Sequence, residues 1–132
     1  MTIAVDTSAL MAIVLGEDDA PLFARAIAAN SGDMCVSAAT VVEATIVAEA
    51  RQGAAAAQDL AAVLREADIR IVALDATQAT IASAAWRRFG KGRHAAALNL
   101  GDCYAYALAR HLGAPLLFKG NDFAQTDIAS AL

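Results

Sequence analysis

Short apolar runs alternate along this chain with longer segments of helical spacing, and this alternation limits the folds open to it. The apolar runs are residues 2–5, 33–38, 69–74 and 115–118. Runs of this length between helical segments are typical of buried strands. Strands that alternate with helices form a parallel sheet flanked by helices, so the sequence predicts an α/β fold.

Six segments between these runs carry helical periodicity and are predicted as helices. They are residues 6–16, 17–30, 39–53, 54–68, 75–90 and 101–113. Thr7 and Ser8 are N-cap candidates for the first helix, because their hydroxyls can accept from free backbone N–H groups. In the third helix, Val42, Ile46 and Ala50 fall along one face. A loop and tail follow the last strand, with room for one more short element.

The chain length of 132 residues predicts a single domain, 1–132, that buries roughly two thirds of its surface. No apolar stretch reaches the ~18 residues that span a bilayer, and the N-terminus lacks a basic leader with a cleavage site. Cys35 and Cys103 form no CxxC pair and are interpreted as reduced thiols. We therefore expect a cytoplasmic protein that does not bind membranes.

Basic residues are concentrated in one segment, although the net charge of −4 argues against non-specific coating of nucleic acid. The segment is WRRFGKGRH, which contains Arg87, Arg88, Lys91, Arg93 and His94. Two interpretations stay open. The segment could be a solvated helix end whose arginines suit the helix dipole. Alternatively, Lys91, Arg93 and His94 could follow an RNA backbone from a loop with two glycines.

Four acids lie next to predicted strands or at helix starts. Asp6 ends the first strand inside the apolar run MTIAVDTSALMAIVL, Glu43 lies in the helix after the second strand, Asp102 opens the last helix, and Asp122 follows the last strand. Open α/β sheets bind ligands at the carboxyl ends of their strands. Clustered carboxylates repel, so a cation is needed to hold them together. With no His or Cys at ligand spacing, the predicted ion is Mg²⁺, with Mn²⁺ as a substitute.

Each of these acids also has an ordinary structural interpretation. Asp6 could cap the first helix, and Asp102 could be a first-turn acid that satisfies the helix dipole. Glu43 could lie on a solvated helix face, and Asp122 could be a turn residue. Asp127 is interpreted as a cap of the last element, or as an additional acid at the cluster. The shared position after strands favours the cluster.

Four motifs resemble the PIN-domain toxins of the VapC type. They are VDTSAL, the glutamate of VVEATIVAEAR, FGKGRHAAALNLGDCYAYALA (with Phe where the family has Tyr) and PLLFKGNDFAQTDI. The motifs span nearly the whole chain in the family's order. The resemblance implies a three-layer α/β sandwich with a short parallel sheet, metal-dependent endoribonuclease activity, a small antitoxin partner and a homodimer.

The motif match also implies roles for the acids. Asp6, Glu43, Asp102 and Asp122 take the family's metal-binding positions. Relatives often carry an acid where this chain has Asn121, so Asp127 is a candidate to share the role of the fourth ligand with Asp122. The expected function is a toxin that cleaves RNA with a metal-activated water.

The residues after Asp6 bear on the phosphate contact and on one of two alternative functions. Thr7 or Ser8, at the start of a helix, could hydrogen-bond the scissile phosphate. An aspartate-nucleophile phosphatase needs a second Asp two residues after Asp6, where Ser8 stands. The other alternative is a non-catalytic interaction module that binds a small protein partner through the same acidic crevice.

Overall fold

A parallel sheet of four short strands forms the centre of the computed structural model, which describes all residues 1–132. The strands are β1 (Ile3–Val5), β2 (Met34–Ser37), β3 (Arg70–Val72) and β4 (Leu116–Leu117). Their order in the sheet is β3-β2-β1-β4, and every pair is parallel. The α/β prediction is confirmed, and all four strands end at the same edge of the sheet.

Six α-helices and one short 3₁₀ helix surround the sheet. They are α1 (Thr7–Val14), α2 (Ala20–Ala29), α3 (Ala38–Gln52), α4 (Ala54–Glu66), α5 (Ala76–Phe89), α6 (Leu100–Leu112) and η1 (Phe123–Gln125). The six predicted helices are all present, with ends within a few residues of the predicted ones. None of them combines the length and the apolar character needed to cross a membrane.

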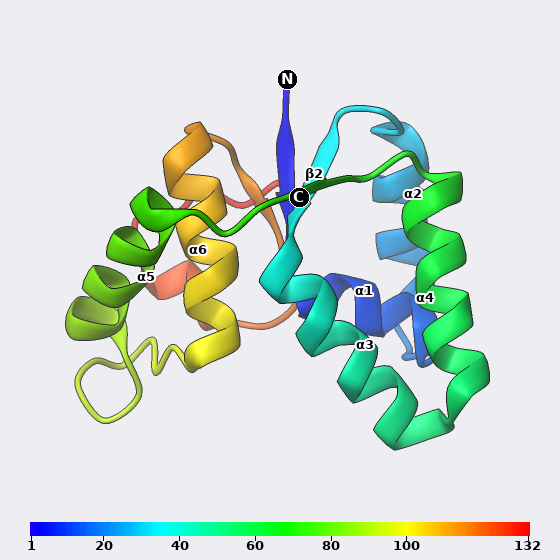
Figure 1. Ribbon diagram of the computed structural model, residues 1–132, viewed down its shortest axis with the longest axis horizontal. Helices are drawn as coiled ribbons and strands as arrows, with labels where there is room; N and C mark the ends of the chain where they lie inside the picture. Colours follow the sequence, from blue (N-terminus) through cyan, green and yellow to red (C-terminus); the bar gives the residue numbers. More distant parts are fainter.

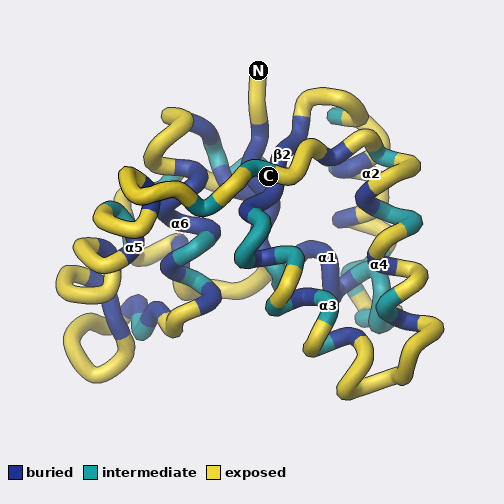
Figure 2. Tube along the Cα trace, viewed as in Figure 1, coloured by how far each residue is buried: buried dark blue, intermediate teal, exposed yellow.

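The helices cover both faces of the sheet (Figure 1), with α5 and α6 on one side and α1 to α4 on the other. Successive side chains of a strand point to opposite faces, which gives two cores. Val5 and Val36 pack with α1 to α4, whereas Ala4 and Cys35 pack with α5 and α6. In Figure 2, β1, β2, β4 and the inward helix faces are buried, whereas the edge strand β3 is largely exposed. The three-layer arrangement is therefore confirmed.

The first helix begins one residue earlier than its predicted caps imply. Asp6 is the N-cap of α1: its backbone is extended, and its carboxylate accepts from the backbone N–H of Ser8. Thr7 is already helical, so the prediction of Thr7 or Ser8 as the cap was wrong. Because β1 ends at Val5, a single residue separates strand from helix. This short turn fixes the Asp6 carboxylate at the carboxyl edge of the sheet.

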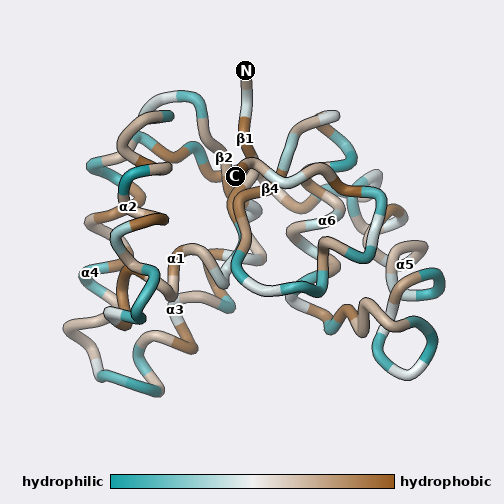
Figure 3. The backbone as a smooth tube through the Cα atoms, turned by 180° about the vertical axis from the view of Figure 1, so that it is seen from behind, coloured by the Kyte–Doolittle hydropathy of each residue, from teal (hydrophilic) through white to brown (hydrophobic).

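The apolar face predicted on the third helix is present in α3 but is not its buried face. Val42 and Ile46 are 59% and 62% exposed, and the buried residues of α3 are Thr40, Ala44 and Ala48. Small side chains on the inner face let α3 lie close to its neighbours. Val42 and Ile46 are left on the surface, whereas Val41 and Val47 are partly buried against the core. In Figure 3 the strands at the centre are the most hydrophobic part of the backbone.

Candidate active site

The four acids predicted at strand ends and helix starts are linked through the charges that act on Asp6 and Asp102. Asp6 follows β1, Glu43 lies in the second turn of α3, Asp102 lies in the first turn of α6, and Asp122 precedes η1 beyond β4. Asp6 experiences the charges of Asp102 and Glu43. Asp102 in turn experiences those of Asp122 and Glu43. The carboxyl edge of the sheet therefore carries a cluster of four carboxylates, which we call the acidic cluster.

Asp6 is the most buried acid, with 3% of its surface exposed. Its Oδ2 accepts from the Ser8 backbone N–H at 3.0 Å and from the Ser8 hydroxyl at 2.6 Å. The pKa of Asp6 is raised to about 7, and burial is the largest cause. The charges of Asp102 and Glu43 also raise this pKa, whereas the two bonds from Ser8 lower it. Two hydrogen bonds thus compensate this carboxylate only in part, and a cation would complete the compensation.

Asp102 is fixed by a reciprocal pair of hydrogen bonds at the start of α6. Its backbone N–H donates to Asn99 Oδ1 at 2.9 Å, and its Oδ2 accepts from the Asn99 backbone N–H at 3.0 Å. This is a capping box with aspartate in the third helical position. The pKa of Asp102 is raised to about 6, and burial is the largest cause. The bond from the Asn99 backbone lowers this pKa, whereas the charges of Asp122 and Glu43 raise it.

Both aspartates therefore cap helices and also belong to the acidic cluster. The structural and functional interpretations of Asp6 and Asp102 are compatible, because a cap uses only part of a carboxylate's four lone-pair sites. The remaining sites are available for another cation or donor. We call these two residues the anchored acids.

Glu43 reaches the cluster from α3 and is oriented by α1. The Thr7 hydroxyl donates to Glu43 Oε1. The Ser8 hydroxyl donates to Asp6 and accepts from the backbone N–H of Lys119 at 2.9 Å. Both hydroxyls at the start of α1 are thus engaged with carboxylates. Their contact with a scissile phosphate stays a prediction.

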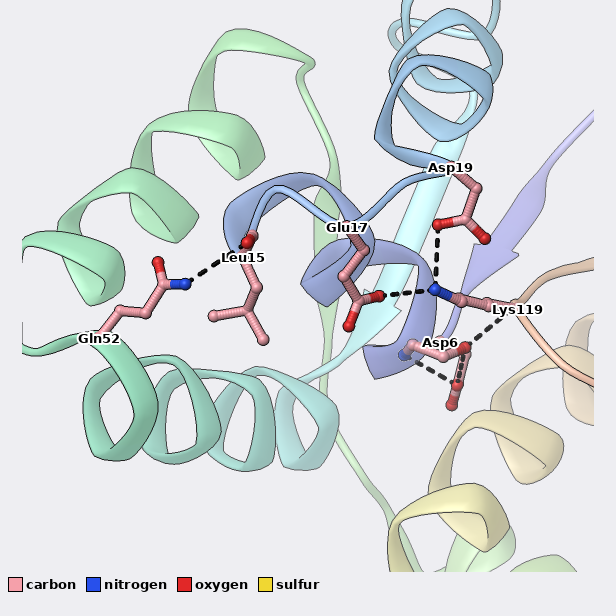
Figure 4. Close-up of polar contacts among 7 residues, drawn as sticks. Asp6, Leu15, Glu17, Asp19, Gln52 and Lys119 are labelled. Atoms are coloured by element: carbon pink, nitrogen blue, oxygen red, sulfur yellow. Dashed lines mark hydrogen bonds and ion pairs between the residues drawn. The ribbon is translucent and has the colours of Figure 1, made fainter.

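Lys119, which the sequence did not single out, ties the loop that carries Asp122 to the turn between α1 and α2 (Figure 4). Its Nζ lies 2.9 Å from Glu17 Oε1 and 3.0 Å from Asp19 Oδ1. These two hydrogen bonds raise the pKa of Lys119, so the ammonium stays charged. Its position directly after the last strand, in LLFKGND, is the one signal that could have identified it.

The donor set of the acidic cluster fits a hard divalent cation. All four side chains are carboxylates, and such oxygen ligands suit Mg²⁺ or Mn²⁺. No three of the protein's acidic, His or Cys side chains are already close enough to form a finished metal cage. Thr7, Ser8 and Asn99 each hold one of these carboxylates by a hydrogen bond. The fit therefore rests on the donor type and on the incompletely compensated charge of Asp6.

The structure does not bring Asp127 to the acidic cluster. Its Oδ1 accepts from the Tyr106 hydroxyl at 2.7 Å, and its Oδ2 lies 3.4 Å from Arg88 Nη1 and 3.6 Å from Arg110 Nη1. Asp127 thus joins the C-terminal segment to α5 and α6. The charges that act on Asp6 and Asp102 do not include it.

The predicted basic segment forms an exposed loop after α5, and we call residues 91–94 the basic loop. The Arg93 guanidinium lies 4.9 Å from the centre of the Trp86 ring, and its Nε donates to the Arg87 carbonyl at 3.0 Å. The His94 ring meets Phe89 edge-on at 5.2 Å between centroids. The loop is hydrophilic in Figure 3 and extends away from the core in Figure 1. Its charged side chains are therefore exposed to solvent, with Arg93 held in part by Trp86 and the Arg87 carbonyl.

Comparison with known proteins defines the class of protein to which this chain belongs. The family model described as "PIN domain" matches residues 3–129. A crystal structure of VapC20 from Mycobacterium tuberculosis, described as a sarcin-ricin loop cleaving toxin, superposes with a TM-score of 0.82 at 20% identity and covers 98% of both chains. A toxin-antitoxin complex from Klebsiella pneumoniae gives a TM-score of 0.71 at 20% identity, over 96% of this chain and 93% of that one.

Closer relatives narrow the class. A protein named Ribonuclease VapC from Mycolicibacterium smegmatis is 48% identical over 96% of this chain and 97% of its own length. Ribonuclease VapC30 from Mycobacterium tuberculosis is 47% identical over 96% of this chain and 95% of its own. The chain belongs to the PIN domain family, in its VapC ribonuclease branch.

Proposed function

We propose that this protein is the toxin of a toxin–antitoxin pair, an endoribonuclease that hydrolyses RNA phosphodiester bonds with a divalent metal ion at the acidic cluster. The observation that carries the proposal is the buried Asp6 carboxylate, which is grouped with three further acids and is only partly compensated by the protein. The names of the close relatives support an RNA substrate and favour an enzyme over a non-catalytic interaction module.

In this proposal Asp6 and Asp102 hold Mg²⁺, for which Mn²⁺ can substitute. Glu43 binds a second ion or orients water, and Asp122 completes the site. When bound, the ion supplies a water of lowered pKa and stabilises charge on the phosphate. Thr7 keeps the Glu43 carboxylate turned toward the anchored acids through its hydroxyl.

The remaining side chains of the site act on position and substrate. Ser8 keeps Asp6 in place and links it to the backbone of Lys119. Lys91, Arg93 and His94 bind the RNA backbone beside the cluster. A chain with net charge −4 needs such a local basic surface to hold a polyanion.

The proposal includes two protein partners, a small cognate antitoxin and a second copy of this chain. Its support is the apolar surface next to Glu43, where Val42, Ile46 and Leu100 are each more than half exposed. With Gly101 and Tyr104 they line a hollow of about 430 Å³ between α3 and α6. Exposed apolar surface of this kind is typical of interfaces. The proposal places the protein in the cytoplasm, together with its RNA substrate.

The test is cleavage of a labelled RNA by purified protein with and without metal. We expect cleavage in Mg²⁺, none in excess EDTA, and recovery when Mg²⁺ or Mn²⁺ is restored above the chelator. The loss of cleavage in EDTA follows from an all-carboxylate site. These side chains do not include a nucleophile activated by a neighbouring base, such as a Ser–His pair, that could act without metal. Cleavage that persists in excess chelator would contradict the metal-dependent mechanism.

A further inference from the structure

Gly101 occupies a helical position that does not require glycine for its backbone. It lies in the first turn of α6, and it is not among the six glycines with positive φ. Glycine in a helix is less stable than alanine, because it loses more backbone freedom on folding. A reason other than conformation must therefore account for glycine at residue 101.

That reason is the space taken by the Glu43 side chain. A Cβ built on Gly101 would overlap the carboxylate carbon of Glu43 and both of its oxygens. The Glu43 carboxylate thus lies directly against the bare Cα of Gly101. Gly101 is the one glycine that lies within a helix, and Gly90, which follows α5, meets Trp86 and no charged group.

Two neighbours of the anchored acids thus determine where Glu43 lies. Thr7, next to Asp6, donates its hydroxyl to Glu43 Oε1, and this bond pulls the carboxylate toward α1. Gly101, next to Asp102, leaves the space into which the carboxylate settles against α6. The bond and the space act on the same carboxylate from two helices. The position of Glu43 relative to Asp6 and Asp102 is therefore fixed by one donor and one absent side chain.

We propose that Gly101 is a positioning residue, whose missing side chain allows Glu43 to join the two anchored acids at the metal site. The inference rests on the proposed function for its link to metal binding, but the steric contact itself does not depend on any metal. Gly101 touches neither substrate nor ion in this proposal. It acts only through Glu43.

The first test is Gly101→Ala, measured by thermal unfolding and by Mn²⁺ titration. The new methyl group meets the far end of a flexible side chain, so the fold can adjust by turning Glu43 away. We expect a melting temperature equal to or above that of the wild type. We also expect Mn²⁺ affinity and RNA cleavage to fall by about 10-fold or more, as is typical when a group that orients a metal ligand is lost. Wild-type Mn²⁺ affinity in this variant would overturn the inference.

The second test is a double-mutant cycle with Glu43→Asp, which shortens the acid by one methylene. The shorter side chain reaches less far over Gly101, so the added methyl group should weaken Mn²⁺ binding less in the Glu43→Asp background than in the wild type. Losses that simply add in the double variant would mean that Gly101 acts through something other than the Glu43 carboxylate, and the inference would fail.

A third measurement keeps the inference separate from the proposed function. In a Glu43→Ala background the overlap disappears, so with EDTA present throughout Gly101→Ala should raise the melting temperature by more than it does in the protein that keeps Glu43. An equal change in the two backgrounds would overturn the steric explanation. If wild-type protein binds no Mn²⁺, the proposed metal site fails, whereas this metal-free cycle still decides whether Gly101 makes room for Glu43.

Discussion

The anchored acids and the exposed charged groups around them are built in opposite ways. Asp6 and Asp102 are held by hydrogen bonds to backbone N–H groups within three residues, and burial raises the pKa of both. Lys91 and Arg93 of the basic loop are exposed to solvent. Both pairs can carry charge, but only the anchored acids are buried, Asp6 fully and Asp102 in part.

This difference separates two requirements of a nuclease site. Groups that bind a small ion must be fixed and partly dehydrated, which opposes folding when no ion is bound. Groups that meet a long, flexible polyanion can remain in water, because their attraction is long-range and adaptable. Substitutions in the anchored acids should therefore affect catalysis and stability in opposite directions. Substitutions in the exposed groups should affect binding alone.

The strongest test of this contrast is Asp6→Asn and Asp102→Asn, each measured for RNA cleavage in Mg²⁺. We expect activity to fall by about 100-fold or more, because each change removes a negative ligand from the ion. Asparagine can still accept the capping bond, so the fold should be retained. Asp75→Asn is the matched control, since Asp75 caps α5 through the same kind of bond. An equal loss in Asp75→Asn would show that capping, not metal binding, controls activity.

The second prediction concerns the stability of metal-free protein between pH 4 and pH 8. The folded-state pKa of Asp6 is raised to about 7, above the unfolded value near 4, so folded Asp6 keeps its proton where the unfolded chain has lost it. Its contribution to stability is therefore greatest below about pH 4 and falls as the pH rises to about 7. In EDTA, Asp6→Asn should match the wild type at pH 4 and melt several degrees above it at pH 8.

The same melting experiment in the presence of metal tests whether Asp6 is a metal ligand. At pH 8, Mg²⁺ should raise the melting temperature of the wild type and leave that of Asp6→Asn nearly unchanged, because a ligand stabilises only the state that binds it. A wild type that gains stability from pH 4 to pH 8 relative to Asp6→Asn would contradict the buried, unpaired carboxylate. Parallel melting curves at every pH would contradict it as well.

The third prediction tests whether Lys119 matters to the acidic cluster. Lys119→Met removes two ion pairs with Glu17 and Asp19, and partly exposed pairs contribute little to stability. We expect a melting temperature within about 3 °C of the wild type but a several-fold weaker Mn²⁺ affinity, since the loop that carries Asp122 loses its tether. Lys119→Arg should retain the affinity. In an Asp122→Asn background Lys119→Met should add no further loss, and an additive loss would separate Lys119 from Asp122.

The sequence predicts the anchored acids well because their signals are local. Asp6 ends an apolar strand at a helix start, and Asp102 lies three residues after a capping Asn99, so one strand and one helix fix each of them. The contacts of Glu43 with Thr7 and Gly101 join α1, α3 and α6, and spacing along the chain does not reveal them. The position of Asp127 is not evident from the sequence for the same reason, because Arg88 and Arg110 hold it through tertiary contacts.

The exposed face of α3 illustrates a second limit on what the sequence predicts. Helical periodicity identifies an apolar face, but it does not say whether that face meets the core or a partner. Val42 and Ile46 define a face as apolar as a core face, and yet Thr40, Ala44 and Ala48 are the residues that pack inward. Close packing favours small side chains there, so burial follows size as well as hydrophobicity.

The last prediction concerns the basic loop and has the smallest expected effect. Lys91→Ala combined with Arg93→Ala should weaken RNA binding and make the slope of log affinity against log salt shallower by about one unit. Each phosphate contact on a single strand contributes roughly −0.7 to this slope through counterion release. The sum of two contacts is reduced here because the Arg93 guanidinium is already engaged with Trp86 and the Arg87 carbonyl.

Arg25→Ala with Arg65→Ala removes the same charge from exposed positions of α2 and α4 and serves as the control. Mn²⁺ affinity should be nearly unchanged in both double variants, since none of these side chains bonds to an acid of the cluster. An unchanged salt slope in the loop variant, or an equal change in the control, would mean that the basic loop is only a solvated helix end.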